Sequence, residues 1–287
     1  GGGEIDDLRF WDGITNPVNQ EVATFTDDFT SYADTTAGDA AWTTNNTGML
    51  RVNPTDDDLD ILFTTTNPAN YPFIYNDLTS VSDTAWVLRF KLSVAGFTTP
   101  GNYNFSAFFG LSSNIAANGF GVAQDGIFLE AKFPVSGTAQ YFAKDVDGAT
   151  PFGAATDATF AHNVAVETIY VEIIRTSSTA YTIELFSDSA YTTSVEKETG
   201  TCSSSTASLR YIKFGCADNS GHATGDFTAT VDDISFWNGI STPNSEGRKI
   251  VFTDNAFEGD AVEYASETTS YDPINGDWTG YVKIPSL

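Results

Sequence analysis

Two pairs of adjacent aspartates are the residues of this 287-residue chain that point most directly to ligand chemistry. Asp27-Asp28 stands near the start of the main β-rich stretch, and Asp232-Asp233 stands near its end. Calcium prefers about six to eight hard oxygen ligands from carboxylates and carbonyls. If the chain folds as a sandwich whose first and last strands lie side by side, the two pairs meet. Calcium is therefore the cofactor that the sequence favours, with Asp27, Asp28, Asp232 and Asp233 as its ligands.

The strand that carries the second pair adds a constraint. Within Val231–Trp237, Asp232 has the same parity as Ile234 and Phe236, and alternate residues of a strand face the same side. A bare carboxylate on an apolar face is costly, so Asp232 needs a cation, several N–H donors or a local β-bulge. These three alternatives stay open. A second acidic run, Asp56–Asp60, fits a solvated loop better than a cation site, and neither group has EF-hand spacing.

Cys202 and Cys216 are the only cysteines of the chain. The stretch between them starts with Ser and Thr residues and ends in a strand-like run, which predicts a hairpin. A disulfide across it is expected in an oxidising compartment, and closing so short a loop contributes roughly 3 kcal/mol in the chain-entropy model. Two buried thiols are the alternative. A zinc site is not indicated, because His162 and His222 are the only histidines and no C-x-x-C occurs.

The residues named above have to be positioned by β-structure. Apolar residues make up 41% of the chain and aromatic residues 14%, and this mixture with many Thr and Ser residues suits half-buried strands. No 3.6-residue periodicity runs over a useful length, so almost no helix is expected. Turn residues separate the candidate strands, which are Phe25–Phe29, Asp60–Thr64, Thr84–Leu92, Phe105–Leu111, Gly126–Phe133, Gln140–Lys144, Ile169–Arg175, Tyr181–Phe186, Leu209–Cys216 and Phe227–Trp237. We predict an all-β fold, an antiparallel β-sandwich or jelly roll whose two sheets share one core, with flanking partial β segments.

The charge of the chain excludes several partners. It carries 13 basic and 38 acidic residues, a net charge of −25. Such a surface repels phosphate backbones, so nucleic acid and anionic membranes are poor partners. No run of about 18 apolar residues occurs, so membrane insertion is not expected. Excess carboxylates stay hydrated in salty water and attract cations, and we expect a secreted, extracellular or cell-surface protein.

The clearest internal signal is a repeat. Residues 5–17 return as residues 231–243, with seven of the thirteen positions identical and four more conservative. Both copies are typical of a strand that ends in a Gly-bearing turn closed by Pro. The second copy ends the β-rich stretch whereas the first precedes it, so the first is a strand from a neighbouring domain or one that pairs elsewhere. This assembly strand would offer its apolar side chains to a partner: Ile5, Leu8, Phe10 and Trp11.

The repeat also sets the predicted domain boundaries. Residues 1–21 would be the terminal strand copy, taken from or donated to a neighbouring domain, and residues 22–243 would be one sandwich. Residues 244–287 hold a polar linker and part of a second β domain, with too few apolar positions for a core of their own. An exposed strand invites pairing with another chain. Self-association, or contact with neighbouring domains of the same protein, is therefore the expected partnership.

The segment Val231–Gly239 resembles the closing strand of laminin-G-like, concanavalin A-like jelly rolls, which commonly reads apolar-Asp-Asp-apolar-x-apolar-aromatic. Phe25–Phe29, Trp86–Leu92 and Phe109–Ser112 resemble segments of large surface proteins of this superfamily, archaeal ones in particular. Residues 250–287 resemble the middle of an uncharacterised β domain that often accompanies such modules. The resemblance implies a laminin-G-like domain of a surface protein, and it specifies the fold better than the function.

The same superfamily includes retaining glucanases, which carry Glu-x-Asp-x-x-Glu on one strand so that two carboxyl groups flank the cleft about 5 Å apart. Glu4–Asp6 matches the first half of this motif, but Arg9 stands at its last position, and Thr230–Ser235 lacks both glutamates. Glu130 and Glu172 stand alone on their strands. Neither histidine lies beside a recognisable nucleophile elbow. The sequence therefore predicts that the protein is not an enzyme.

Two functions are left by this reasoning. The first is a structural or adhesive module of an extracellular surface protein or filament, which assembles through strand pairing and calcium. The alternative is a lectin-like module that binds carbohydrate, which requires exposed aromatic side chains on a face or loop rim. The candidates near loops are Tyr103, Phe105, Phe120, Tyr141 and Phe152. Most aromatic residues of a β-rich chain lie in its core, and the sequence names no sugar.

Overall fold

The computed structural model of the chain describes residues 23–241, except for residues 64–71, 99–103, 116–118, 152–156, 204 and 219–225. The described residues belong to one compact unit, Val22–Pro243. The predicted segments 1–21 and 244–287 lie outside the described residues, and so does the assembly strand with Ile5, Leu8, Phe10 and Trp11. Their roles and the predicted domain boundaries therefore stay predictions.

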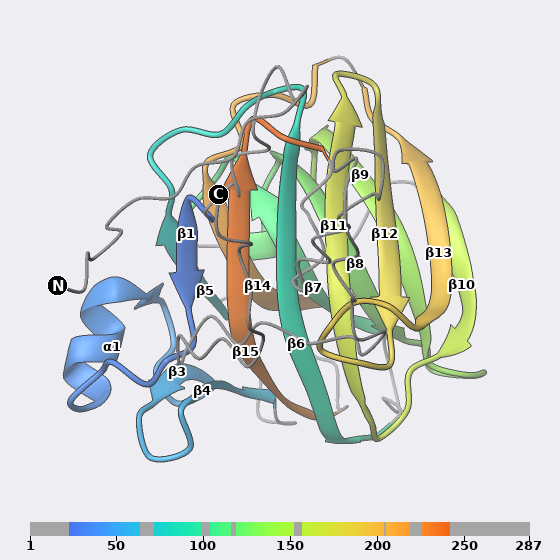
Figure 1. Cartoon of the computed structure of the whole chain (residues 1–287). Helices are drawn as coiled ribbons and strands as arrows, with labels where there is room; N and C mark the ends of the chain where they lie inside the picture. The colour runs from blue at the N-terminus through green and yellow to red at the C-terminus, as the bar shows by residue number, and fades with distance from the viewer. Residues whose placement is uncertain are drawn as a thin grey trace, which may run out of the picture. The chain divides into compact units, whose positions relative to one another are not determined.

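Two antiparallel sheets lie face to face in this unit (Figure 1). We call the eight-stranded sheet sheet A; its order is β13 (Ser194–Thr201), β12 (Ala180–Phe186), β11 (Thr168–Ser177), β6 (Trp86–Phe97), β15 (Phe227–Asn238), β4 (Asp58–Phe63) and β3 (Leu50–Asn53), and β1 (Phe25–Asp27) also pairs with β15. The seven-stranded sheet is sheet B; its order is β10 (Ala158–Asn163), β9 (Gln140–Ala149), β8 (Gln124–Phe133), β7 (Phe105–Ser112), β14 (Tyr211–Asp218), β5 (Phe73–Asp77) and β2 (Thr43–Thr44). The predicted all-β sandwich is confirmed.

Each of the ten predicted strands has a counterpart among these elements. Five strands were not predicted: β2, β3, β5, β10 and β13. Helix is confined, within the described residues, to α1 (Thr35–Ala41) and the 3₁₀ turn η1 (Gly119–Gly121). Asp34 caps α1 by accepting a hydrogen bond from the Ala37 N–H at 2.9 Å, which satisfies one of the donors left open at a helix start. No helix among these residues is long and apolar enough to cross a membrane.

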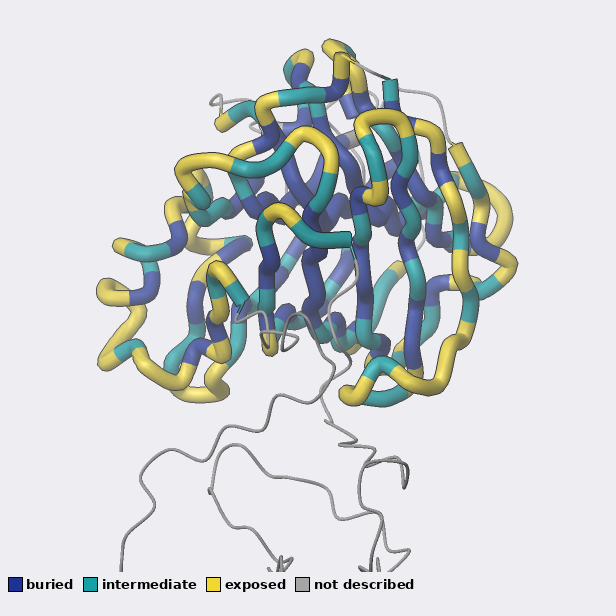
Figure 2. The backbone as a smooth tube through the Cα atoms, turned by 45° about the horizontal axis from the view of Figure 1, so that its top comes forward, coloured by how far each residue is buried: buried dark blue, intermediate teal, exposed yellow. Residues whose placement is uncertain are grey.

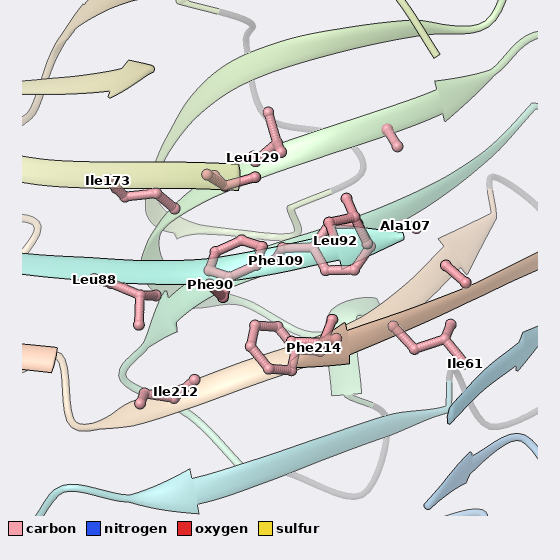
Figure 3. Packing of buried hydrophobic residues seen from close by; sticks show 14 of the residues in the cluster. Ile61, Leu88, Phe90, Leu92, Ala107, Phe109, Leu129, Ile173, Ile212 and Phe214 are labelled. Atoms are coloured by element: carbon pink, nitrogen blue, oxygen red, sulfur yellow. The ribbon is translucent and has the colours of Figure 1, made fainter. Parts of the chain in front are cut away.

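The core lies between the two sheets. Along β6 the buried side chains Trp86, Leu88, Phe90 and Leu92 share one face, as the alternation predicts. Phe90 packs against residues of sheet B, with its ring centre 5.6 Å from that of Phe214 (Figure 3). Figure 2 shows where the buried and exposed residues lie, with buried residues along the strands and exposed residues in the turns. Each fully buried large apolar side chain contributes about 1.5–3 kcal/mol, so this interface dominates the stability.

The predicted disulfide between Cys202 and Cys216 is wrong. Cys202 follows β13 at the edge of sheet A, whereas Cys216 lies in β14 in the middle of sheet B. The hairpin expected between them does not form, because β14 pairs with β7 and β5 instead. Both residues are buried and both remain thiols. Burial raises the pKa of the Cys202 thiol to about 12.

Candidate functional site

The first aspartate pair lies beside the last strand, as predicted, but its carboxylates face different surroundings. Asp27 stands opposite Ile234 in the β1–β15 pair. Its buried carboxylate accepts hydrogen bonds from the Phe29 N–H at 2.9 Å, the Tyr32 hydroxyl at 2.5 Å and the Trp42 indole N–H at 2.7 Å. The carboxylate oxygens act as acceptors, and these three donors satisfy them. Asp28 accepts locally from Thr30, through its N–H and its hydroxyl.

A β-bulge explains how Asp232 avoids the apolar core. The register of β15 against β6 shifts between Asp232 and Ser235, and Asp233 has a φ of 52°. Val231 and Ile234 are both buried, so both aspartates point away from the core. Asp232 accepts from Lys91 Nζ at 3.0 Å and from the Asp233 N–H at 2.7 Å. Of the three alternatives that the strand parity leaves open, the bulge is present, and the Lys91 ammonium and the Asp233 N–H act beside it.

Asp232 meets the second acidic run rather than Asp27. Strand β4 pairs with β15, which places Thr230 opposite Asp60. Burial, together with the smaller effect of the neighbouring charges of Asp60, Asp56 and Asp232, raises the pKa of Asp58 to about 6. No group of three or more acidic, histidine or cysteine side chains in the described ranges is arranged to hold a metal ion. Calcium binding by Asp27, Asp28, Asp232 and Asp233 stays a prediction.

The two glutamates that the sequence leaves isolated form buried ion pairs on opposite sides of the sandwich. On sheet A, Glu172 accepts from Arg89 at 2.6 Å and 2.7 Å through two nitrogens of the guanidinium. The Arg89 guanidinium lies 4.4 Å from the centre of the Tyr191 ring. On sheet B, Glu130 accepts from Lys144 Nζ at 3.0 Å and from the Ser106 hydroxyl at 2.6 Å. Such pairs are stable only with close geometry and additional hydrogen bonds. Both pairs have close geometry, and the Ser106 hydroxyl supplies an additional hydrogen bond to Glu130.

The Glu130 pair belongs to a second buried cluster, on the face of sheet B that points away from the core. Phe108 and Phe128 flank it there, outside the main core. The segment with η1 places Phe120 over both rings, with centroid distances of 4.9 Å to Phe108 and 5.4 Å to Phe128. Gly215 makes room beneath, since a Cβ on it would come within 2.6 Å of the Phe120 ring. We call this cover of η1 and Phe120 the roof.

Lys213 lies under the roof. Its Nζ donates to the Asn114 carbonyl at 2.7 Å and to Gln124 Oε1 at 3.1 Å. The Phe120 and Phe73 ring centres lie 4.7 Å and 4.9 Å from the same nitrogen. Burial lowers the pKa of the Lys213 ammonium to about 7. The sequence did not single out this lysine, because only the pairing of β14 with β7 and β5 brings it under the roof.

Beyond the roof, the same face of sheet B carries a groove at the tip of the β8–β9 hairpin. Its volume is about 270 Å³, and it is lined by Lys132, Pro134, Ser136, Gly137, Thr138, Gln140 and Phe142. Gly137 has a φ of 108°, which the hairpin turn requires and which side chains rarely adopt. Lys132 Nζ lies 5.7 Å from the centre of the Phe142 ring, and both side chains are half-buried. The groove thus offers an aromatic surface, an ammonium and an amide.

The aromatic residues that the sequence proposed for sugar contact lie elsewhere. Phe105 and Tyr141 are core residues, and Phe120 is part of the roof. Tyr103 and Phe152 lie outside the described residues. Phe142 was missed because its neighbour Tyr141 is also aromatic, so the sequence does not tell which of the two faces outward.

Comparison with known proteins identifies the fold. No family model matches the sequence, and no curated protein matches it. A pseudo β-1,3-glucanase and immunostimulatory antigen of Mycobacterium tuberculosis is 11% identical over 75% of this chain and 98% of its own, with a TM-score of 0.52. A glycosyl hydrolase family protein of Mycobacterium fortuitum is 10% identical over 75% and 99%, with a TM-score of 0.50. A legume lectin-like domain of Entamoeba histolytica is 12% identical over 76% and 98%, with a TM-score of 0.47.

The two structures with TM-scores of 0.50 and 0.52 show that the chain shares their fold, a sandwich of two antiparallel sheets. They also correct the prediction that the protein is not an enzyme, because a glycosyl hydrolase family protein shares the fold. That prediction relied on the absence of recognisable catalytic motifs, the glucanase strand and a nucleophile elbow beside a histidine. A fold can carry different chemistries at different sites, so a missing motif on one strand does not exclude catalysis.

Proposed function

We propose that the protein binds carbohydrate in the groove between Lys132 and Phe142. The observation that carries the proposal is a half-buried aromatic ring beside side chains that donate and accept hydrogen bonds. A sugar ring has an apolar C–H face, which packs on the negative face of an aromatic ring. Its hydroxyls need donors and acceptors, and Gln140 and Lys132 supply these. The groove volume lies near the lower end of the range of roughly 300–1,000 Å³ typical of small-molecule sites.

The fold supports this proposal in a general way. The two proteins with the highest TM-scores given above are described as a pseudo β-1,3-glucanase and a glycosyl hydrolase family protein, and both descriptions concern sugars. Their low identity carries the fold alone, so the argument for binding depends on the groove. Placement of the protein on a cell surface and its laminin-G-like character stay predictions.

Substitution of the aromatic ring tests the proposal. Phe142→Ala should abolish binding to the glycans that the wild-type protein retains on a glycan array, because the stacking surface is lost. Tyr170→Ala is the matched control, since this half-buried aromatic residue lies on sheet A, away from the groove. A Phe142→Ala variant that keeps its fold and binds the same glycans as the wild type would exclude the groove as the site.

A structural role in assembly is the second candidate, and one observation favours it. The second repeat copy forms most of β15, which lies between β6 and β4 and also pairs with β1. The first copy has a closely similar sequence, so it is suited to the same position in a neighbouring chain. Deletion of residues 1–17 should then reduce the mass of the assembly in light scattering. Unchanged mass after the deletion contradicts this role.

A further inference from the structure

Lys132 differs from the other basic side chains of the described part of the chain. Six of them lie within 4.0 Å of a carboxylate oxygen: Arg51, Arg89, Lys91, Lys144, Lys197 and Arg210. Arg175 and Lys213 donate to carbonyl or amide oxygens inside the fold. Lys132 has no carboxylate within that distance among the described residues, although the chain carries a net charge of −25. A half-exposed lysine without a counter-charge in so acidic a protein needs an explanation.

The groove has no negative charge of its own. Lys132 is the only charged residue among those that line it. The nearest carboxylate along the strand belongs to Glu130, and the Lys144 ammonium already neutralises it at 3.0 Å. An ammonium in an acid-free depression attracts an anion, and a charge-assisted hydrogen bond to an anion is about twice as strong as a neutral one.

The spacing of the two groups fits one ligand. In the β8–β9 pair Lys132 lies opposite Gln140, and Glu130 lies opposite Phe142, so Lys132 and Phe142 are diagonal neighbours. The 5.7 Å between Lys132 Nζ and the Phe142 ring centre is comparable with the width of one sugar ring. A sugar stacked on Phe142 therefore directs a ring substituent towards the ammonium.

We infer that the groove selects acidic carbohydrate, a sugar that carries a carboxylate or a sulfate ester. The anionic group contacts the Lys132 ammonium while the sugar ring packs on Phe142. This inference rests on the proposed function and names the substrate class for it. The net charge of the protein repels a long polyanion at low ionic strength, but at 0.15 M salt the Debye length of about 8 Å screens distant carboxylates and leaves the direct contact. Short acidic oligosaccharides are therefore the expected ligands.

Calorimetric titration at about 0.15 M salt with three oligosaccharides of similar length tests the inference. The probes are an oligogalacturonate, a chondroitin sulfate fragment and a neutral cello-oligosaccharide. At least one acidic probe should bind about tenfold more tightly than the neutral one, as a hydrogen bond to a charged group predicts. The probe that binds more tightly identifies the carboxylate or the sulfate as the preferred group. Sodium sulfate alone should compete weakly, because it lacks the ring.

Three variants separate the local contact from general charge effects. Lys132→Gln should lower the affinity for the acidic probe to that for the neutral one, and Lys132→Arg should retain most of the preference. Lys197→Gln is the control, because it removes the same charge from sheet A, where Lys197 pairs with Glu184. An equal loss in Lys132→Gln and Lys197→Gln overturns the inference.

The remaining outcomes distinguish the inference from the proposed function. Equal binding of acidic and neutral probes, abolished by Phe142→Ala, overturns the acidic preference and leaves carbohydrate binding in place. Sodium sulfate that competes as strongly as the acidic oligosaccharide also overturns the preference, because the groove would then recognise an anion without its sugar. No binding of any probe to a folded protein overturns both.

Discussion

The outer faces of the two sheets carry charge in opposite ways. On sheet A, the strands β4 and β15 collect carboxylates, and Lys91 and Arg51 neutralise only part of them. On sheet B, Lys132 on the outer face of β8 has no carboxylate within 4.0 Å among the described residues, and Lys213 on the outer face of β14 donates to the Asn114 carbonyl and the Gln124 amide oxygen. Sheet A therefore resembles the chain as a whole, which is strongly acidic. Sheet B departs from it.

A similar buried ion pair on each face makes this contrast clearer. The Arg89–Glu172 side chains on sheet A are each 7% exposed, and the Lys144–Glu130 side chains on sheet B are 2% and 1% exposed. Both pairs are neutral overall, so neither accounts for the difference between the faces. The difference comes from the groups around them, and it locates the candidate site where the Lys132 ammonium has no carboxylate within 4.0 Å among the described residues.

The largest expected effect comes from breaking the Lys144–Glu130 pair, which is less exposed than the Arg89–Glu172 pair. Lys144→Met leaves the Glu130 carboxylate buried with the Ser106 hydroxyl as its remaining donor, which should lower the free energy of unfolding by about 3–5 kcal/mol. Urea unfolding measures this loss. Arg89→Met should cost less, because Glu172 retains more contact with water.

The double variant Glu130→Gln/Lys144→Met is the control for that experiment. It removes the uncompensated charge together with its partner and should recover most of the stability. A Lys144→Met variant that loses less than about 1 kcal/mol, the value of an exposed pair, would show that the outer face of sheet B is wet.

The next effect concerns the lysine under the roof. Because burial lowers the pKa of Lys213 to about 7, the unfolded chain binds more protons than the folded one between pH 7 and pH 10. Wild-type stability should therefore rise through this window by up to about 1.4 kcal/mol per pH unit, and Lys213→Met should lack that slope. Unfolding of both proteins at several pH values checks the slope. Parallel curves for the two proteins contradict the assignment.

The smallest effect concerns Asp58 on sheet A, and its change of stability with pH has the opposite sign to that of Lys213. The pKa of Asp58 is raised to about 6, so its contribution to stability is present below pH 4 and is lost as the pH rises through 6. Asp58→Asn should stabilise the protein at pH 8 by an amount on the order of 1 kcal/mol, after allowance for screening by solvent. The gain should vanish near pH 4, and thermal melts at both pH values measure it. Equal stabilisation at the two pH values would be evidence against a charge effect.

The fold was accessible from the sequence because apolar alternation is a local property. Strands such as β6 show it plainly, whereas β13 does not, since Ser194–Thr201 is a polar edge strand with most of its side chains exposed or half-buried. Its place is set by long-range contacts, among them the Glu196 carboxylate, which accepts the N–H groups of Ala161 and His162 across the edge of the sandwich.

The residues of functional interest were much less accessible, because they depend on which strands pair and on which face each side chain takes. Asp232 and Asp58 come together only because β15 pairs with β4, and the sequence of neither segment predicts this pairing. Phe142 faces outward only because Tyr141 faces inward, and both are aromatic. Lys132 stands out only after the other basic residues have been paired in space.

The bulge at Asp232 and Asp233 changes which residues of β15 face the core. Upstream of it the odd-numbered residues Phe227, Ala229 and Val231 are buried, and downstream the even-numbered Ile234 and Phe236 are buried. One extra residue thus reverses the alternation of buried and exposed side chains while the strand continues. Deletion of one of these two aspartates would give both halves of the strand the same alternation. The first repeat copy carries the same adjacent pair at Asp6 and Asp7. The length of this segment, more than the identity of any one residue, decides which side chains reach the core.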